Sequence, residues 1–238
     1  MTALVTGGGG GIGSAVVARV ARRGPVLATY FDHAERADAL AAELNADGGE
    51  VVVRRADLTV TSEVVATFDT AEELGPITAV VNCVGGWDYP RLTDVDDDAI
   101  DASLALNLRS ALLVLRESAR RVVDGGRIVM LSSAAVGVAP ARQVTYVAAK
   151  AGVEGAMRVA AKELAKRQIT VNVVRPGSTD TETLHRTTAE KAVAAMSTAN
   201  AMRRLGTPDD VAGAVDLMLS PDSSWVTGQI IGADGGLY

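Results

Sequence analysis

The stretch TGGGGGIG, from Thr6 to Gly13, places five consecutive glycines near the start of a chain of 238 residues. Glycine loses more conformational freedom on folding than any other residue, so an ordered run of glycines needs a structural reason. A short apolar run precedes the glycines, and the amphipathic stretch Ser14–Arg23 follows them. This order predicts a turn from a strand into a helix, where free N–H groups and the helix dipole favour a bound phosphate. The spacing of Gly7, Gly11 and Gly13 also fits a tight turn with a purely structural role.

The rest of the chain alternates between short apolar runs and longer amphipathic stretches. We expect strands at residues 3–5, 26–30, from 51, 77–82, 127–131 and 169–174, and helices at 14–23, 34–44 and from about 62. The apolar runs are nearly continuous, which is typical of parallel strands covered on both faces. The sequence therefore predicts an α/β fold with a doubly wound parallel sheet and helices on both faces. No linker, repeat or low-complexity tract divides the chain, so we expect a single domain over residues 1–238.

Composition excludes several classes of protein. Apolar residues make up 48% of the chain, which is too many for a disordered protein. The net charge of −6, without a long basic stretch, argues against a nucleic-acid partner. A lone cysteine, Cys83, rules out an intramolecular disulfide, and two distant histidines, His33 and His185, argue against a zinc site. We expect no metal, no spanning helix and a cytoplasmic location.

A second motif lies far downstream, where Tyr146 and Lys150 form a Tyr-x-x-x-Lys pattern. On a helix this spacing puts both side chains on one face. A cation beside a phenol favours the phenolate and lowers the phenol pKa, which makes Tyr146 a candidate general acid. Taken alone, the pattern also fits a surface pair on a helix. Its occurrence after the glycine-rich turn favours the chemical interpretation.

With both motifs in this order, the chain from Thr6 onward resembles the short-chain dehydrogenase/reductase superfamily, and its pattern is most similar to 3-oxoacyl-[acyl-carrier-protein] reductases and related ketoreductases. The resemblance implies a Rossmann-type sheet of about seven strands and a catalytic tetrad of Asn107, Ser133, Tyr146 and Lys150. It also implies a set of residues that contact the dinucleotide. They are Gly7, Gly10, Gly11, Ile12, Gly13, Tyr30, Phe31, Asp57, Leu58, Asn82, Val84, Gly85, Tyr146, Lys150, Pro176, Gly177, Thr179 and Thr181. Cys83 and Val84 depart from the Asn-Asn-Ala-Gly segment of the family, and Asp57 also fits the cap of a strand end.

The resemblance implies hydride transfer between a nicotinamide and a carbonyl or secondary alcohol. Ser133 and Tyr146 would donate hydrogen bonds to the substrate oxygen, and Tyr146 would supply the proton. Lys150 would lower the pKa of Tyr146 and hold the nicotinamide ribose, and Asn107 would position a water. The first expectation is ketoreduction of a 3-oxoacyl thioester or a similar ketone. The alternatives are oxidation of a small alicyclic or aromatic alcohol and, in another class, a dinucleotide-sensing regulator without turnover.

Cofactor choice depends on the end of the second expected strand. In the family, NAD enzymes usually carry an acidic residue where this chain has Tyr30, and the next position is Phe31. NADP enzymes often carry a basic or small polar residue at this next position or in the glycine loop, at the position of Gly10. Asp32 lies two residues beyond the usual acidic position, and Arg54 or Arg55 lies on the third strand. The missing acidic residue favours NADP(H) over NAD(H).

The substrate side of the site is expected in two segments. Trp87 and Tyr89 follow the fourth expected strand, and in a chain with 3% aromatic residues they are candidates for lining a substrate pocket. Residues 181–203 are expected to form a lid. Its cations Arg186 and Lys191, with Arg203 and Arg204, could meet a substrate on acyl-carrier protein or coenzyme A, or be ordinary surface charges.

Two further stretches are informative. Small residues crowd the helix after Tyr146, and related proteins pair this helix with the Asn107 helix across a two-fold axis. We therefore expect a homotetramer first and a dimer second.

The acidic run Asp94–Asp98 resembles a metal site, but capping of a helix start explains it better.

Overall fold

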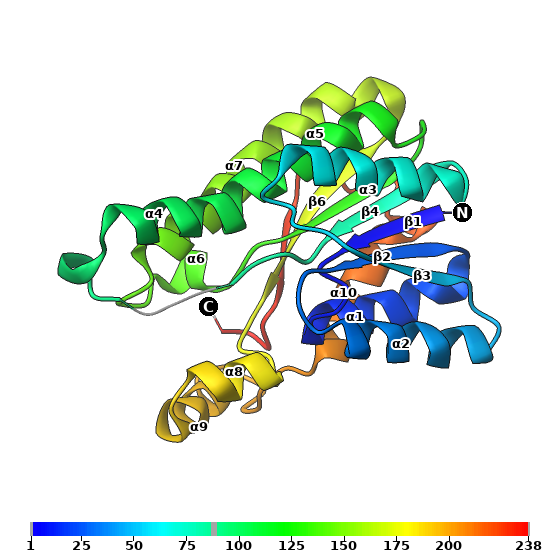
Figure 1. Ribbon diagram of the computed structural model, residues 1–238. Helices are drawn as coiled ribbons and strands as arrows, with labels where there is room; N and C mark the ends of the chain where they lie inside the picture. The colour runs from blue at the N-terminus through cyan, green and yellow to red at the C-terminus, as the bar shows by residue number, and fades with distance from the viewer. Residues whose placement is uncertain (1, 87–89, 238) are drawn as a thin grey trace.

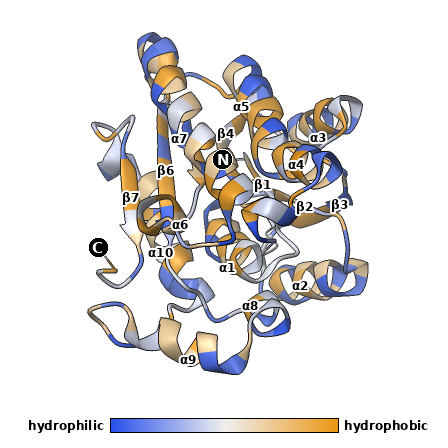
Figure 2. Ribbon diagram, turned by 90° about the vertical axis from the view of Figure 1, so that its left-hand side faces the viewer, coloured by the Kyte–Doolittle hydropathy of each residue, from blue (hydrophilic) through white to orange (hydrophobic). Residues whose placement is uncertain are grey.

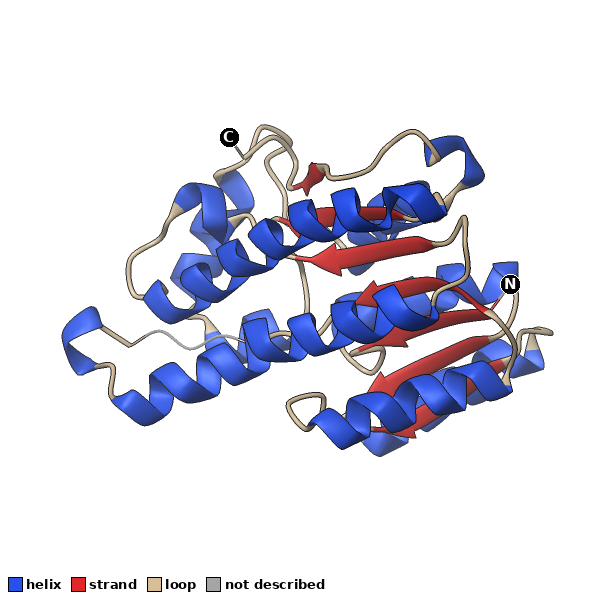
Figure 3. Ribbon diagram, turned by 90° about the horizontal axis from the view of Figure 1, so that it is seen from above, coloured by secondary structure: helices blue, strands red, loops and turns tan. Residues whose placement is uncertain are grey.

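The computed structural model describes residues 2–86 and 90–237. Its centre is one sheet of seven parallel strands in the order β3-β2-β1-β4-β5-β6-β7 (Figure 3). The strands are β1 (Thr2–Thr6), β2 (Val26–Tyr30), β3 (Val51–Arg55), β4 (Ile77–Asn82), β5 (Arg127–Leu131), β6 (Thr170–Pro176) and β7 (Ile230–Ala233). The chain winds outward from β1 in one direction and from β4 in the other. The predicted doubly wound parallel sheet is confirmed.

Helices cover both faces of the sheet (Figure 1). One face carries α3 (Thr61–Glu73), α5 (Ser110–Arg121) and α7 (Val144–Leu164). The other face carries α1 (Gly11–Val20), α2 (Ala34–Ala46) and α10 (Pro208–Leu219). Shorter helices lie beyond one end of the sheet: α4 (Asp97–Leu104), α6 (Ala135–Val138), α8 (Glu182–Thr187) and α9 (Glu190–Thr198).

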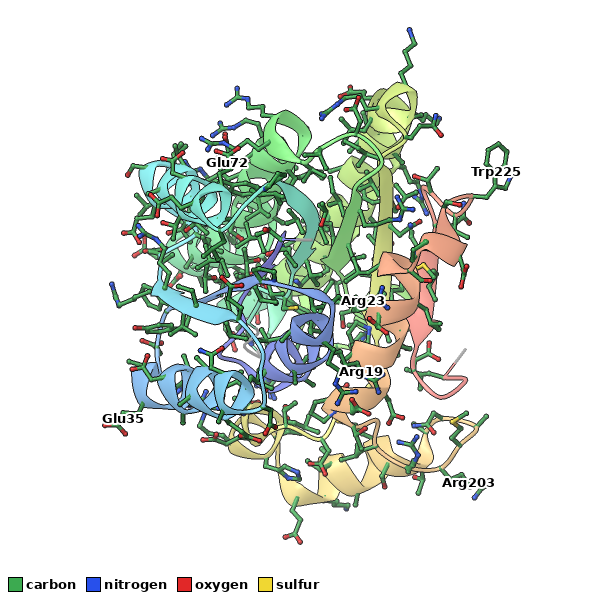
Figure 4. All side chains as sticks on the ribbon, turned by 90° about the vertical axis from the view of Figure 1, so that its right-hand side faces the viewer. Arg19, Arg23, Glu35, Glu72, Arg203 and Trp225 are labelled. Atoms are coloured by element: carbon green, nitrogen blue, oxygen red, sulfur yellow. The ribbon has the colours of Figure 1, made fainter. Side chains whose placement is uncertain are left out.

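The core consists of two apolar layers, one on each side of the sheet. Along β1, Leu4 packs into the layer beneath α3, α5 and α7, whereas Val5 packs into the layer beneath α1 and α10. Successive side chains of a strand point to opposite faces, so a strand covered on both sides is apolar throughout. The helices carry both hydrophobic and hydrophilic residues, as the colours of Figure 2 show, because only one side of each helix that covers the sheet packs on it. Ion pairs between Arg19 and Asp209 and between Arg23 and Asp216 link α1 and the segment after it to α10, each at 2.6 Å (Figure 4).

Helix α1 begins three residues earlier than the sequence predicted, at Gly11 rather than Ser14. The N–H of Ser14 already donates to the carbonyl of Gly10 at 2.8 Å, so the last glycines form the first helical turn. Strand β6 extends to Pro176, beyond the predicted end at Val174, because Pro176 pairs with Ala233 of β7. The prediction for the acidic run is confirmed, since the Asp96 carboxylate accepts from Ala99 N at 2.8 Å and caps α4.

The carboxyl ends of β1, β2, β4, β5 and β6 meet along one edge of the sheet. The strand order reverses between β1 and β4, and a ligand crevice forms at such a switch point. The predicted site residues come from the strand ends and loops at this edge and from the helices that begin near it. Among the described residues, no helix has the length and apolar character needed to cross a membrane.

Candidate active site

The glycine-rich loop joins β1 to α1 and exposes the N-terminus of the helix. A Cβ atom at Gly13 would overlap the carbonyl oxygen of Gly7, so the first turn of α1 packs directly on the loop. Gly7 has a φ of 73°, and its N–H donates to Thr29 Oγ1 at 3.1 Å. Gly10, the N-cap residue, is exposed and offers no side chain that would occupy the helix start. This combination leaves room for an anion beside the N-terminus of α1.

A cavity of about 420 Å³ lies next to this loop at the switch point. Its lining consists of Gly7, Gly9, Gly10, Thr29, Tyr30, Phe31, Asp32, His33, Ala56, Asp57, Leu58, Thr59, Cys83, Val84, Gly85, Leu106 and Ser110. Eight of the predicted cofactor residues are therefore brought together: Gly7, Gly10, Tyr30, Phe31, Asp57, Leu58, Val84 and Gly85. The lining residues lie at the ends of β2 and β3, in the glycine loop and after β4.

The position of Asp57 is compatible with both interpretations that the sequence left open. Its Oδ1 accepts hydrogen bonds from Thr59 N at 2.9 Å and from Thr59 Oγ1 at 2.7 Å, which fixes the turn after β3. The same residue lines the cavity. Asp57 therefore holds its own loop in place and also faces the cavity.

Lys150 is almost fully buried on α7, at an exposed fraction of 3%. Its ammonium donates to the carbonyl oxygens of Val84 and Leu131, each at 3.1 Å, at the ends of β4 and β5. Burial lowers the pKa of Lys150 to about 8, an effect that the nearby Cys83 opposes in part. The Nζ atom lies 6.0 Å from the centroid of the Tyr146 ring, on the same helix face. The predicted pair is thus assembled, with the cation held beside the phenol.

Asn107 lies in a π-helical turn, Ala105–Arg109, between α4 and α5. Its Nδ2 donates to Gly86 O at 2.9 Å and to Ser103 O at 3.1 Å, and its Oδ1 accepts from Gly86 N at 3.0 Å. A Cβ at Gly85 would lie 2.8 Å from Lys150 Nζ and 3.1 Å from Asn107 Oδ1. A larger residue at Gly85 would therefore separate these two polar groups. A widened turn of this kind is common at functional sites.

The remaining predicted residues lie around the same edge of the sheet. Ser133 follows β5 and is partly buried, and its Oγ accepts from Ala135 N at 3.1 Å. Pro176 ends β6, and Gly177 N donates to Ala233 O at 2.9 Å. Thr179 is buried, and Thr181 caps α8 by accepting from Leu184 N at 3.2 Å. Ile12 lies in the first turn of α1 and is partly buried.

Two buried groups near the glycine loop bear on its chemistry. Asn82 Oδ1 accepts from Thr6 Oγ1 at 2.5 Å, and Asn82 Nδ2 has no partner among the described residues. A buried donor of this kind needs an acceptor from water or from a ligand. Burial raises the pKa of the Cys83 thiol to about 12, although the nearby Lys150 acts in the opposite direction. Little of the Cys83 thiol is therefore in the nucleophilic thiolate form at neutral pH.

Comparisons with known proteins agree with this geometry. A family model described as enoyl-(acyl carrier protein) reductase matches residues 8–238. A short-chain type dehydrogenase/reductase from Picea abies is 37% identical, over 98% of this chain and 91% of its own length. A dehydrogenase/reductase from Sinorhizobium meliloti 1021 has a TM-score of 0.94 at 35% identity, covering 99% and 94% of the two chains. A short-chain dehydrogenase from Burkholderia cenocepacia J2315, solved in complex with NADP, has a TM-score of 0.93 at 35% identity, covering 99% and 97%.

The chain belongs to the short-chain dehydrogenase/reductase family. It is therefore an NAD(P)-dependent oxidoreductase, and its seven-stranded sheet is the Rossmann-type sheet of that family. The residues around the glycine loop fit a dinucleotide, because the helix start is open, the adjoining cavity reaches the ends of β2, β3 and β4, and the buried Asn82 amide donor has no acceptor among the described residues.

The substrate side of this dehydrogenase/reductase is described in part. Trp87 and Tyr89 lie outside the described residues. The expected lid contains α8 and α9, and Arg36 on α2 pairs with Glu182 on α8 at 3.3 Å. Arg186, Lys191 and Arg203 are exposed, and Figure 4 shows Arg203 projecting from the surface. The guanidinium of Arg204 makes hydrogen bonds of 2.6 Å and 3.0 Å to the carboxylate of Asp210, which fits the alternative of an ordinary surface charge.

Several lining residues of this site were not among the predicted ones. Thr29 binds the glycine loop, and Leu106 and Ser110 reach the cavity from the π-helical turn and the start of α5. His33 lines the cavity in a left-handed conformation, with a φ of 64°. His33 could have been predicted from the sequence, because it follows β2 at the ligand edge of the sheet. Leu106 and Ser110 could not, because their place in the cavity depends on how the Asn107 segment folds over the sheet.

Proposed function

We propose that this enzyme reduces a ketone with NADPH, with Tyr146 as the proton donor and a 3-oxoacyl thioester as the leading substrate class. The observation that carries the proposal is the buried Lys150 ammonium beside the Tyr146 ring. A regulator that only senses a dinucleotide does not need this pair, whereas proton transfer to a reduced carbonyl does.

When bound, the nicotinamide cofactor supplies the hydride for the carbonyl carbon. The protein stabilises the negative charge on the carbonyl oxygen and supplies the proton to it. Ser133 and Tyr146 donate hydrogen bonds to this oxygen as negative charge grows on it, and the Tyr146 hydroxyl then gives up its proton. The positive charge of Lys150 favours this loss, because it stabilises the phenolate that Tyr146 becomes.

Lys150 and Asn107 have further roles in this proposal. Lys150 holds the ribose hydroxyls next to the nicotinamide, and two carbonyl oxygens fix its position. Asn107 positions a water that returns a proton from solvent to Tyr146 by way of Lys150. The π-helical turn supports this role, since it places the Asn107 amide across Gly85 from the ammonium.

Residues near the ends of β2 and β3 support the proposed preference for NADP(H). The guanidinium of Arg55 lies over the Phe31 ring, 4.9 Å from its centroid, and Phe31 lines the cavity. This cation can meet a 2′-phosphate on the adenine ribose. The NADP complex of the Burkholderia cenocepacia relative points the same way. Asp32, which also lines the cavity, opposes the preference by repelling a phosphate.

Two observations support a thioester substrate. The first is the set of exposed cations around the expected lid, Arg186, Lys191 and Arg203, and the second is the description of the matched family model. A carrier phosphopantetheine ends in a phosphate that such cations attract. A smaller alicyclic or aromatic substrate, lined by Trp87 and Tyr89, is the alternative.

We also propose that the protein is a homotetramer. Along α7, the exposed residues Val144, Ala148, Ala151, Gly155 and Val159 form one face of small and β-branched side chains. On α5, Leu112 is 42% exposed. The exposed apolar face of α7, together with the exposed Leu112 on α5, favours pairing with a second copy, and a dimer is the second choice.

Oxidation of NADPH followed with three probes tests the proposed function: trifluoroacetophenone, acetoacetyl-coenzyme A and crotonyl-coenzyme A. We expect turnover of the activated ketone and of the 3-oxo thioester, and none of the 2-enoyl thioester, because the site is built to protonate an oxygen. Binding of NADPH without turnover of any probe would favour the sensor. Turnover of crotonyl-coenzyme A in place of the two ketones would contradict carbonyl reduction.

A further inference from the structure

A buried carboxylate lies one helical turn beyond Lys150. Glu154 is 4% exposed and belongs to the same face of α7 as Tyr146 and Lys150. Its Oε1 accepts from Arg175 Nε at 2.6 Å and from Ser132 Oγ at 2.7 Å, and its Oε2 accepts from Arg175 Nη2 at 2.6 Å. The guanidinium and the carboxylate thus form a two-point contact, which fixes both distance and orientation.

The three partners come from three different segments of the site. Ser132 immediately precedes Ser133 at the end of β5, and Arg175 immediately precedes Pro176 near the end of β6. The two strand ends are also joined to each other, since Ser132 N donates to Val174 O at 3.0 Å and Ala134 N donates to Pro176 O at 2.9 Å. Glu154 therefore ties α7 to the point where both strands leave the sheet.

Stability alone is a weak explanation for this arrangement. Removing a carboxylate and a guanidinium from water is costly, and apolar residues of similar volume often replace a buried ion pair without loss of stability. What a two-point ionic contact adds is one defined position of each partner. Proton transfer and hydrogen bonding to the same oxygen depend on such positions, because small displacements of reacting groups slow a reaction strongly.

We propose that Glu154 is a positioning residue, which holds Ser133 after β5 and Tyr146 on α7 in register by binding Ser132 and Arg175 at the same time. The proposal for catalysis rests on the proposed function, in which Ser133 and Tyr146 share one substrate oxygen. The proposal also has a structural part, namely that the ends of β5 and β6 keep a fixed register against α7. This part is measured by hydrogen exchange and does not depend on catalytic turnover.

The test compares Glu154→Gln with Glu117→Gln as a matched control. Glu117 on α5 is also a buried carboxylate, 2% exposed, and it accepts from Arg116, Arg120 and Arg121. It lies two turns along α5 from Ser110 and touches none of the predicted tetrad residues in the described structure. Both variants lose one buried negative charge, so a general effect of that loss is common to them. The double variant Glu154→Met/Arg175→Met removes both charges of the positioning contact and guards against a failure to fold.

Three readouts are measured on the full-length enzyme: hydrogen exchange of the Ser132 and Ala134 amides, the NADPH Kd, and kcat with its primary deuterium isotope effect on trifluoroacetophenone. For Glu154→Gln and the double variant we expect faster exchange at these amides, an NADPH Kd within about threefold, and kcat lower by about tenfold or more with a larger isotope effect. Glu117→Gln should keep the exchange rates of these amides and kcat per folded molecule.

Unchanged exchange at Ser132 and Ala134 in both Glu154 variants would overturn the proposal. So would faster exchange with an unchanged kcat per folded molecule, since the contact would then be structural alone. If the wild-type enzyme reduces no ketone, the proposed function fails, and the exchange rates still decide whether Glu154 holds the strand ends.

Discussion

The Nζ atom of Lys150 lies 6.0 Å from the centroid of the Tyr146 ring and is held there by the carbonyl oxygens of Val84 and Leu131. Both acceptors are neutral, and the ammonium is almost fully buried. Burial therefore dominates, and the pKa of Lys150 is lowered to about 8. The charge state of this group changes close to neutral pH, with consequences for binding as well as for catalysis.

Affinity for NADPH should weaken as the pH rises through about 8, the pKa of Lys150. Below this pH the folded enzyme carries the ammonium, which donates to the ribose hydroxyls, and above it the neutral amine binds them less well. Fluorescence titration of NADPH at a series of pH values measures this dependence. The Lys150→Met variant should bind more weakly and lose the break near pH 8, and a break that persists in it would assign the effect to another group.

Substitution of Gly13 by alanine should abolish tight cofactor binding and lower the Tm. The added Cβ would overlap the Gly7 carbonyl oxygen and push the first turn of α1 away from the loop. Gly213→Ala is the control, because in α10 its added Cβ meets no atom closer than 3.8 Å. It should bind NADPH normally and gain stability of up to about 1 kcal/mol from helix propensity. Equal NADPH affinity in the two variants would argue against the loop as the phosphate site.

Arg55→Gln should weaken NADPH binding about tenfold and leave NADH binding nearly unchanged, because the lost cation meets a 2′-phosphate that NADH lacks. Arg54→Gln is the control. Its side chain points to the other face of β3, where its guanidinium reaches Thr70 Oγ1 at 3.4 Å. Titration of each of the two variants with NADPH and with NADH gives four dissociation constants, which are compared with those of the wild-type enzyme. A parallel loss for NADPH and NADH in Arg55→Gln would place the arginine elsewhere in the site.

Gly155→Glu should convert the proposed tetramer into a smaller species, because it puts a charge in the middle of the exposed face of α7. Light scattering after size exclusion measures the mass against the 24.5 kDa of one chain. Ala42→Glu is the control, because it adds an acid to the exposed surface of α2, outside this face, and should keep the wild-type mass. A wild-type mass of one chain would contradict the assembly outright.

Much of the fold was readable from local sequence because its signals are local. The strand Val26–Tyr30 and the end of β4 at Asn82 match the expected bounds, since buried parallel strands are continuous apolar runs. The cap at Asp96 also follows from a local rule. The start of α1 was placed too late, because glycine disfavours a helix interior yet is accepted in the first turn, where the phosphate loop needs it.

The site was readable where residues sit at fixed spacings, as with Tyr146 and Lys150 on one helix face. It was not readable where contacts join distant segments. Nothing in the sequence around Glu154 indicates that its carboxylate meets Ser132, 22 residues away just after β5, and Arg175, 21 residues away on β6. The π-helical turn around Asn107 is equally hidden, because it depends on packing over Gly85 and Gly86 rather than on propensity.

The most direct test of the account is the kcat of Tyr146→Phe for the reduction of trifluoroacetophenone by NADPH, measured together with the NADPH Kd. The substitution removes one hydroxyl and keeps the ring beside Lys150. The account predicts a kcat at least about 100-fold below that of the wild-type enzyme, with an NADPH Kd that stays within about threefold. A variant that retains full activity would contradict the assignment of Tyr146 as the proton donor.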